Sequence, residues 1–293
     1  MQPMQCPVRA YEGSASLTAM TLAQRLGYDA DARLLIITSD NLGMYHAANV
    51  ACYESLREGI ATNASVMVPA PWAREAVRGY RGAHVGVHLT LNADFSCYRW
   101  NSITHAPTLH SGEGGFPRTA ADLWEHADSD EVRRECRAQI ERAVVWGFDP
   151  THLDSHLNAL VLRPELFDIY IDLACEFRLP IRLADQVTED TAGFPLRTLA
   201  EQQGILSPDR TAQLHGEDRT AAFADFVASL TPGVTELSMQ PAIDTPELHA
   251  LLGDTPARIG DHAVLTHPTS RSILAQAGIE LISWAAIRNL QRS

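Results

Sequence analysis

Polar side chains with catalytic chemistry follow or interrupt several apolar runs of this sequence. They are Asp40 and Asn41 in RLLIITSDNLGM, His88 in GVHLTLN, and His152, Asp154 and His156 in PTHLDSH. Two imidazoles and an oxygen ligand that face an open position make a metal centre suited to hydrolysis. A metal in such a centre polarises a carbonyl and lowers the pKa of bound water. A nearby carboxylate such as Asp40 could then take the proton of that water.

Each of these residues also has a plain structural explanation. Asp40 and Asn41 could form an Asx turn that starts the next helix. A lone histidine such as His88 is more often a hydrogen-bonded core residue, and the polar residues of PTHLDSH could form a satisfied polar edge. Taken together, however, they favour a site, because the carboxyl ends of parallel strands converge on one mouth. A further run, ELSMQP, adds Glu236 and Gln240 at another predicted strand end.

The elements that would position these residues alternate between strand and helix. Apolar or alternating runs predict strands at 34–38, 64–68, 84–91, 151–154, 181–183, 235–239 and 280–283. Helical spacing predicts helices at 45–58, 72–80, 130–146, 164–177, 220–230, 246–252, 270–277 and 285–290. Residues 187–220 have mixed patterning that allows short helices. The alternation indicates an α/β fold with a parallel sheet or barrel and outer helices.

The chain divides into a short amino-terminal segment and one large domain. We expect residues 1–32 to form a loose arm with a short helix at 17–26. Residues 33–293 show no linker or internal repeat. The segment 92–118 is glycine-rich and long for a loop in a compact domain, which predicts a functional rim or lid. Its aromatic residues Tyr98, Trp100 and Phe116 could stack on a sugar ring or simply anchor the loop.

Composition excludes some classes of partner. A formal charge of −13 over 293 residues argues against nucleic acid or an anionic membrane as partner. No apolar run reaches the length of a membrane span, and the start of the chain lacks a signal-peptide pattern. Five scattered cysteines predict a reducing compartment, so we expect a cytoplasmic protein. A homodimer is the common arrangement of soluble enzymes, although no residue here argues for one.

Taken in order, TSDNLGM, GVHLTLN, PTHLDSH and ELSMQP resemble the motifs of the YdjC-type carbohydrate deacetylases, which include chitooligosaccharide deacetylases. The resemblance covers residues 33–290. It implies an irregular (β/α) barrel, TIM-barrel-like, with a divalent metal at its mouth and an N-acetylated sugar as substrate. Zinc, nickel or cobalt would suit two histidines and one amide better than magnesium, which stays the alternative.

The resemblance also implies a role for each residue of the site. The implied set is Asp40 as general base, Asn41, His88 and His156 as metal ligands, His152 and Asp154 as their supporting partners, Arg182 orienting the base or the substrate, and Gln240 at the position of an acid. Two of these depart from the family pattern, which has an aspartate at the position of Asn41 and often a histidine at that of Gln240. An amide ligand brings no charge, and an amide side chain does not titrate.

Three functions stay open at this point. The leading hypothesis is a metal-dependent hydrolase that removes the acetyl group from an N-acetylated sugar or amino-sugar conjugate. In this hypothesis, Asn41 and Gln240 could weaken or silence the activity. The alternative is a diverged, non-hydrolytic barrel that binds a sugar-like metabolite, or that uses Asp40 in a different acid/base reaction. A scaffold without a small-molecule site is the third. The sequence argues against it, because chance rarely places so many reactive residues at strand ends.

Overall fold

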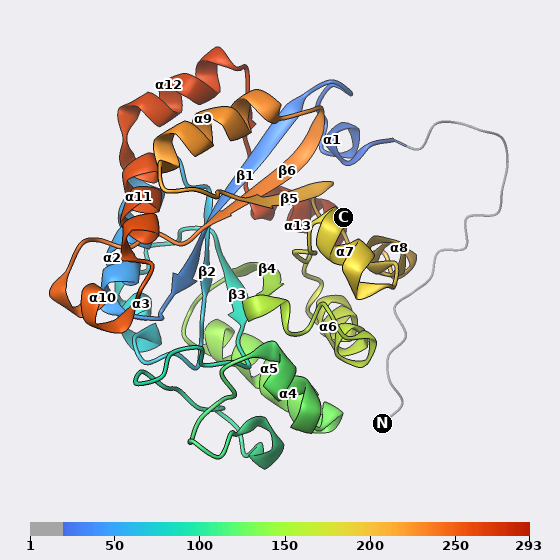
Figure 1. The fold of residues 1–293 in the computed structure, drawn as a ribbon. Helices are drawn as coiled ribbons and strands as arrows, with labels where there is room; N and C mark the ends of the chain where they lie inside the picture. Colours follow the sequence, from blue (N-terminus) through green and yellow to red (C-terminus); the bar gives the residue numbers. More distant parts are fainter. Residues whose placement is uncertain (1–19) are drawn as a thin grey trace, which may run out of the picture.

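The structure is a computed structural model, and it describes residues 20–293. The predicted arm over residues 1–18 lies outside the described residues. Within the described part, seven parallel strands form one sheet in the order β4-β3-β2-β1-β6-β5, and β7 pairs with the amino-terminal half of β1 (Figure 1). The strands are β1 (Arg33–Leu42), β2 (Asn63–Val66), β3 (Val85–Leu89), β4 (Pro150–Ser155), β5 (Arg210–Gln213), β6 (Gly233–Met239) and β7 (Glu280–Leu281).

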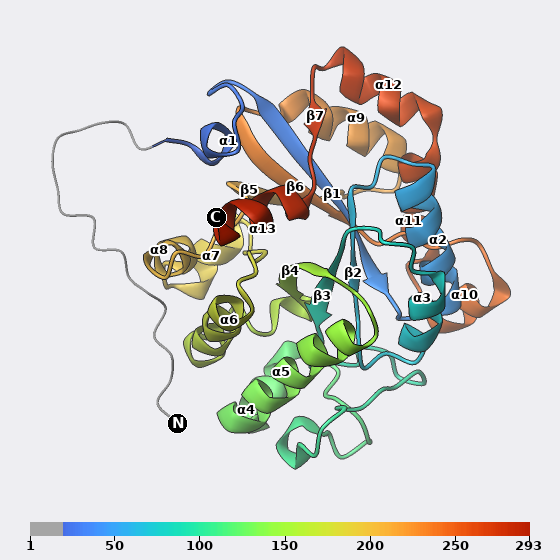
Figure 2. The same ribbon diagram turned by 180° about the vertical axis from the view of Figure 1, so that it is seen from behind.

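Helices surround this sheet, as Figure 2 shows from behind. They are α1 (Leu22–Arg25), α2 (His46–Arg57), α3 (Ala73–Gly79), α4 (Ala120–His126), α5 (Ser129–Val145), α6 (Pro164–Phe177), α7 (Gln186–Ala192), α8 (Leu196–Gln202), α9 (Arg219–Ser229), α10 (Pro246–Leu251), α11 (Thr255–Thr266), α12 (Pro268–Gln276) and α13 (Trp284–Arg292), with 3₁₀ turns η1 (Pro107–Leu109) and η2 (His156–Asn158). The predicted α/β fold with parallel strands and outer helices is confirmed.

Alternation along the strands divides the core into an inner and an outer layer. On β1, Leu35 and Ile37 pack outward in one cluster, whereas Leu34 and Ile36 pack in another with Trp284 of α13. Further along the inner face of β1 the side chains become polar. The inner face is therefore apolar at the amino ends of the strands and polar at their carboxyl ends, which is where a site can form.

The sheet curves into a half-barrel whose seam lies between β4 and β5. The predicted strand at 181–183 is wrong as a strand, since it makes only a single bridge from Ile181 to Leu153. A hydrogen bond from Thr211 Oγ1 to Leu183 O at 3.1 Å links the same segment to β5. The strand β5 itself went unpredicted, because its four residues are exposed or half-buried and carry no apolar run.

The predicted rim or lid at 92–118 is a well-anchored wall. Buried Glu135 of α5 accepts hydrogen bonds from Ile103 N at 3.0 Å and Thr104 N at 2.9 Å. Trp100 and Phe116 are buried, so they anchor the loop and do not offer a surface for a sugar ring. Buried hydrogen bonds of this kind favour a fixed loop.

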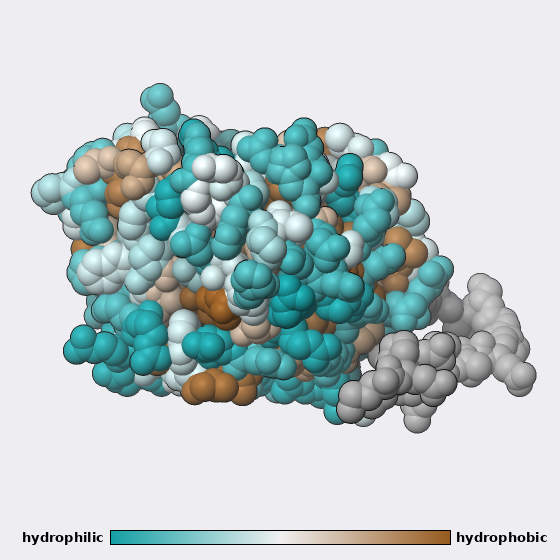
Figure 3. All heavy atoms as spheres, turned by 90° about the horizontal axis from the view of Figure 1, so that it is seen from below, coloured by the Kyte–Doolittle hydropathy of each residue, from teal (hydrophilic) through white to brown (hydrophobic). Residues whose placement is uncertain are grey.

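The molecular surface at the carboxyl ends of the strands is mostly hydrophilic. Figure 3 views the molecule from the side toward which β1 and β3 run in Figure 1, and hydrophobic colour appears there only as separate spots. The large apolar side chains exposed in the described residues are Met20, Val144, Val145, Leu157, Val187 and Leu281. None of the helices in residues 20–293 is long and apolar enough to cross a membrane.

Candidate metal and catalytic site

Arg182 is the hub of a buried network of carboxylates. Its Nη1 donates to Asp40 Oδ2 at 2.8 Å and to Asp154 Oδ2 at 2.7 Å. Its Nη2 donates to Asp40 Oδ1 at 2.9 Å and to Glu236 Oε1 at 2.7 Å, and its Nε donates to Glu236 Oε2 at 2.9 Å. Asp40 and Glu236 are thus both held in bidentate pairs, which fixes the orientation of the two carboxylates.

Glu236 completes this network from β6. Its Oε1 also accepts from Thr38 Oγ1 at 2.6 Å and from Trp284 Nε1 at 2.9 Å. Burial would raise the pKa of Glu236, but the Arg182 guanidinium, together with His152 and the Thr38 hydroxyl, outweighs burial and holds the pKa below its usual value. Three carboxylates face one guanidinium, so with all three ionised the cluster carries two excess negative charges, which favours a divalent cation nearby.

Asp40 and Asp154 respond differently to the same surroundings. Burial raises the pKa of Asp40, and the opposing charge of Arg182 does not fully compensate. Burial acts on Asp154 in the same direction, but His88 and Arg182 outweigh it and hold the pKa of Asp154 well below its usual range. Asp154 is therefore the more firmly ionised of the two, and Asp40 is the carboxyl better suited to take up a proton.

His88 and His156 meet at the mouth of the half-barrel. His88 Nε2 lies 3.1 Å from His156 Nδ1, and the second nitrogen of each ring contacts a carboxylate. His88 Nδ1 lies 2.5 Å from Asp154 Oδ2, and His156 Nε2 lies 3.2 Å from Asp94 Oδ1. Metal-binding histidines typically have this arrangement, with one nitrogen anchored by a carboxylate and the other directed at the ion.

The break at the end of β4 allows His156 to act separately from His152 and Asp154. These three alternate residues would share one face of an extended strand. However, β4 ends at Ser155, and His156 begins the turn η2, in which Leu157 has a left-handed backbone with φ of 54°. His156 thereby reaches His88, while Asp154 stays on the inner face of β4.

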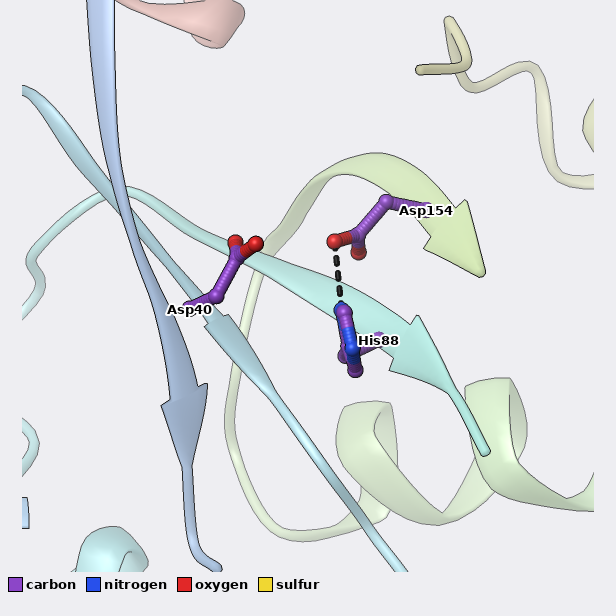
Figure 4. A group of neighbouring side chains, drawn as sticks. All are labelled: Asp40, His88 and Asp154. Atoms are coloured by element: carbon purple, nitrogen blue, oxygen red, sulfur yellow. Dashed lines mark hydrogen bonds and ion pairs between the residues drawn. The ribbon is translucent and has the colours of Figure 1, made fainter. Parts of the chain in front are cut away.

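A second grouping of ligand atoms lies beside the histidine pair. One ligand atom from each of Asp40, His88 and Asp154 lies within 4.8 Å of the other two. Figure 4 shows the two carboxylates turned toward each other and His88, on β3, joined to Asp154 by a dashed line. These three residues could hold a metal ion. Both carboxylates already accept hydrogen bonds from Arg182, whose positive charge would repel a cation placed between them.

The remaining predicted ligand, Asn41, is buried. It lies near the end of β1 with φ of 68°, and neither its Oδ1 nor its Nδ2 has a hydrogen-bond partner among residues 20–293. Unpartnered buried polar atoms are costly, so the amide is explained best by a bound group. Asn41 Oδ1, His88 Nε2 and His156 Nδ1 are oxygen and nitrogen donors that fit a divalent transition metal.

Two predicted residues lie further from this centre. His152 stacks on Trp284 with ring centroids 4.5 Å apart, and its Nε2 lies 4.0 Å from Asp154 Oδ1. Gln240 follows β6 and is half-buried, and its backbone N–H donates to Asp261 Oδ2 at 3.0 Å. The structure thus brings Asp40, Arg182, Asp154, His88 and His156 into one network, with His152 behind it.

Sequence reasoning gave no role to Glu236, Asp94 or Trp284. Glu236 carried a signal, since it is a charged residue in the predicted strand of ELSMQP, where only a partner could make its burial tolerable. Asp94 and Trp284 carried none, because their contacts to His156 and Glu236 span 62 and 48 residues.

Comparison with known proteins gives concordant matches over most of the chain. The family model described as YdjC-like protein matches residues 34–276. A carbohydrate deacetylase of Thermus thermophilus is 38% identical, covering 92% of this chain and 98% of that protein. A carbohydrate deacetylase of Geobacillus stearothermophilus is 30% identical (86% and 97%), and a chitooligosaccharide deacetylase of Yersinia pestis is 26% identical (86% and 98%).

A solved structure agrees with the fold. The crystal structure of a protein from Enterococcus faecalis V583, described as a candidate for cellobiose-phosphate cleavage, superposes with a TM-score of 0.76 at 24% identity, covering 87% of this chain and 99% of that one. At that identity the likeness concerns the fold alone. The match to the family model and the similarity of this chain to the Thermus enzyme show that the chain belongs to the YdjC-like protein family.

Proposed function

We propose that this protein is a carbohydrate deacetylase, which hydrolyses the N-acetyl group of an amino sugar or amino-sugar conjugate to acetate and a free amine. The observation that carries the proposal is the pair of facing nitrogens, His88 Nε2 and His156 Nδ1, beside a carboxylate held by Arg182. The names of the Thermus, Geobacillus and Yersinia relatives supply the substrate class.

The roles of the residues follow from their surroundings. His88, His156 and Asn41 would hold the metal, for which zinc, nickel or cobalt suit the donors best. When bound, a divalent metal polarises the acetyl carbonyl and lowers the pKa of water. Asp40 takes a proton from the attacking water, and Arg182 keeps the Asp40 carboxylate oriented for this transfer. The leaving nitrogen gains a proton as its bond to the acetyl carbon breaks.

Gln240 limits how that last proton can be supplied. An amide can donate a hydrogen bond to the substrate but cannot release a proton. The proton that Asp40 removes from water is therefore available for return to the leaving amine. Asp40, with its pKa raised by burial, suits this double use better than a fully solvated aspartate.

Acetate release from a panel of N-acetylated sugars, with added divalent metal, tests the proposal. The unaltered chain and Asn41→Asp are compared, because the carboxylate should bind the metal more tightly. Release by both forms supports the proposal with the amide as ligand, and release by Asn41→Asp alone indicates a deacetylase silenced at its metal ligand. His88→Ala is expected to lose both bound metal and activity, and unchanged metal content in that variant would contradict the site.

A second function is favoured by two amides that stand at positions where the family pattern has an aspartate and often a histidine. Asn41 and Gln240 both replace groups that carry or transfer charge, which suits a barrel that binds a sugar-like metabolite without hydrolysis. It predicts tight ligand binding with no acetate release from either form. The dispersed cysteines support a cytoplasmic location, and a homodimer stays a prediction.

A further inference from the structure

We propose that Asp94 is a positioning residue of the metal site, which fixes the ring of His156 so that Nδ1 is the nitrogen facing His88. The inference rests on the proposed site at His88 and His156. Asp94 lies in the loop after β3 and belongs to none of the motifs on which the site was predicted. Its Oδ1 lies 3.2 Å from His156 Nε2.

The hydrogen-bond roles decide which nitrogen carries the proton. An ionised carboxylate only accepts hydrogen bonds, so His156 Nε2 must be the donor toward Asp94. A neutral imidazole has one donor and one acceptor nitrogen, which leaves the lone pair on Nδ1. That atom is the one that lies 3.1 Å from His88 Nε2. Without Asp94, the remaining contact of His156 would favour the other tautomer, because Nε2 of a neutral His88 that donates from Nδ1 to Asp154 can accept a hydrogen bond from His156 Nδ1–H.

Asp94 differs from the carboxylate that anchors the neighbouring histidine. Asp154 holds His88 Nδ1 but also accepts hydrogen bonds from Arg182 and Ser65, so its charge is shared. The predicted ligands Asn41, His88 and His156 are all neutral groups when they bind a cation. Asp94 therefore places a negative charge one imidazole away from the cation, where it strengthens His156 as a ligand.

The loop backbone on both sides of Asp94 is fixed by Arg99. Its Nη1 donates to Ala93 O at 2.6 Å and to Phe95 O at 3.2 Å, the two carbonyls that flank Asp94. Its Nη2 donates to Phe116 O at 2.5 Å, which ties this turn to the far end of the same loop. Because one guanidinium holds these carbonyls, the position of Asp94 is fixed by the structure of the loop.

The test uses Asp94→Ala and Asp94→Asn, with Glu113→Gln as the matched control, since Glu113 is an exposed carboxylate of the same loop. Ring ¹⁵N NMR of the metal-free protein reports the tautomer, and His156→Gln assigns the signal. Competition with a chelator reports zinc affinity. We expect His156 to be the Nε2–H tautomer in the unaltered protein and in Glu113→Gln, and to shift toward the Nδ1–H tautomer in Asp94→Ala.

Zinc affinity should fall about 10- to 100-fold in Asp94→Ala, as for other outer-shell partners of metal-binding histidines. Asp94→Asn should lose less, because its Oδ1 still accepts from Nε2 but carries no charge. Unchanged zinc affinity in both folded variants, or an Nδ1–H tautomer in the unaltered protein, overturns the inference. Zinc binding with the expected losses but no acetate release contradicts only the proposed function, whereas no zinc binding by the unaltered protein overturns both.

Discussion

Five hydrogen bonds from one buried guanidinium determine the chemistry of this site at the scale of the residue. All five N–H donors of Arg182 are used, by Asp40, Asp154 and Glu236. A lysine could not reproduce these two bidentate pairs, because its ammonium has three donors and no planar geometry. Arg182 therefore acts both as the counter-charge of the carboxylates and as the element that sets their directions.

Arg182→Met should reduce the free energy of unfolding by about 3–5 kcal/mol, because it leaves three buried carboxylates without their cation. Arg137→Met is the matched control, since Arg137 also pairs with a carboxylate, Glu176, but at the surface with 41% of its side chain exposed. The control should lose less than about 1 kcal/mol. Urea denaturation at neutral pH measures both, and equal losses would contradict the buried network.

At the scale of the element, β3 approaches β4 closely enough that only glycine fits at position 86. A Cβ built on Gly86 would lie 2.3 Å from Cε1 and 2.4 Å from Nδ1 of His152. The His152 ring in turn stacks on Trp284 and cannot retreat without disturbing α13. Because Gly86 of β3 has no side chain, the buried ring of His152 from β4 fits beside it.

Gly86→Ala should lower the free energy of unfolding by about 1–3 kcal/mol through overpacking. Gly112→Ala serves as its control, because a Cβ at Gly112 would meet nothing within 4 Å. Chemical denaturation of the two variants beside the unaltered protein gives the comparison. A Gly86→Ala protein as stable as Gly112→Ala would mean that the His152 ring can move.

At the scale of the whole molecule, α13 closes the amino end of the half-barrel and leaves the carboxyl end for the site. Trp284 packs with Leu34, Ile36 and Val234 of the inner face, and its Nε1 donates to Glu236. Arg288 Nη1 donates to Pro150 O at 3.0 Å at the start of β4. The last helix of the chain thereby supports the site from behind.

Acid stability of the whole molecule should depend on His152. Burial lowers the pKa of His152 from 6.5 to about 4, so between these values the unfolded chain binds a proton that the folded protein does not. Its contribution to stability is therefore lost as the pH falls through this window. Between pH 7.5 and pH 5 the loss should be about 2 kcal/mol from this group.

His152→Phe keeps a ring that can stack on Trp284 but does not titrate, so it isolates this contribution. The drop in the free energy of unfolding between the two pH values should be about 2 kcal/mol smaller in the variant than in the unaltered protein. Denaturant titrations at both pH values measure it. An identical drop in the two proteins would show that His152 already takes up a proton in the folded state.

Helices and strands could be predicted from the sequence where a local residue pattern defines them. They were predicted wrongly where a strand depends on hydrogen bonds to another strand that is distant in the sequence. The apolar run of β1, the spacing of α5 and the proline at the start of α6 are local signals that the structure matches. Conversely, the residues 181–183 have the pattern of a strand but form only a single bridge. The residues of β5 lack the pattern of a strand, yet they pair with β6 over four residues. Pairing with a distant strand decided both.

The sequence by itself determined the fold class and the reactive side chains at the strand ends, because apolar periodicity and residue chemistry are local properties. Only the tertiary structure decided how these side chains pair. It placed Asp40, Asp154 and Glu236 on one guanidinium and joined Asp94 to His156 across 62 residues. Hydrogen bonds, ion pairs and burial depend on distances between strands and loops that a one-dimensional pattern does not contain, and these distances set the charge and geometry of the site.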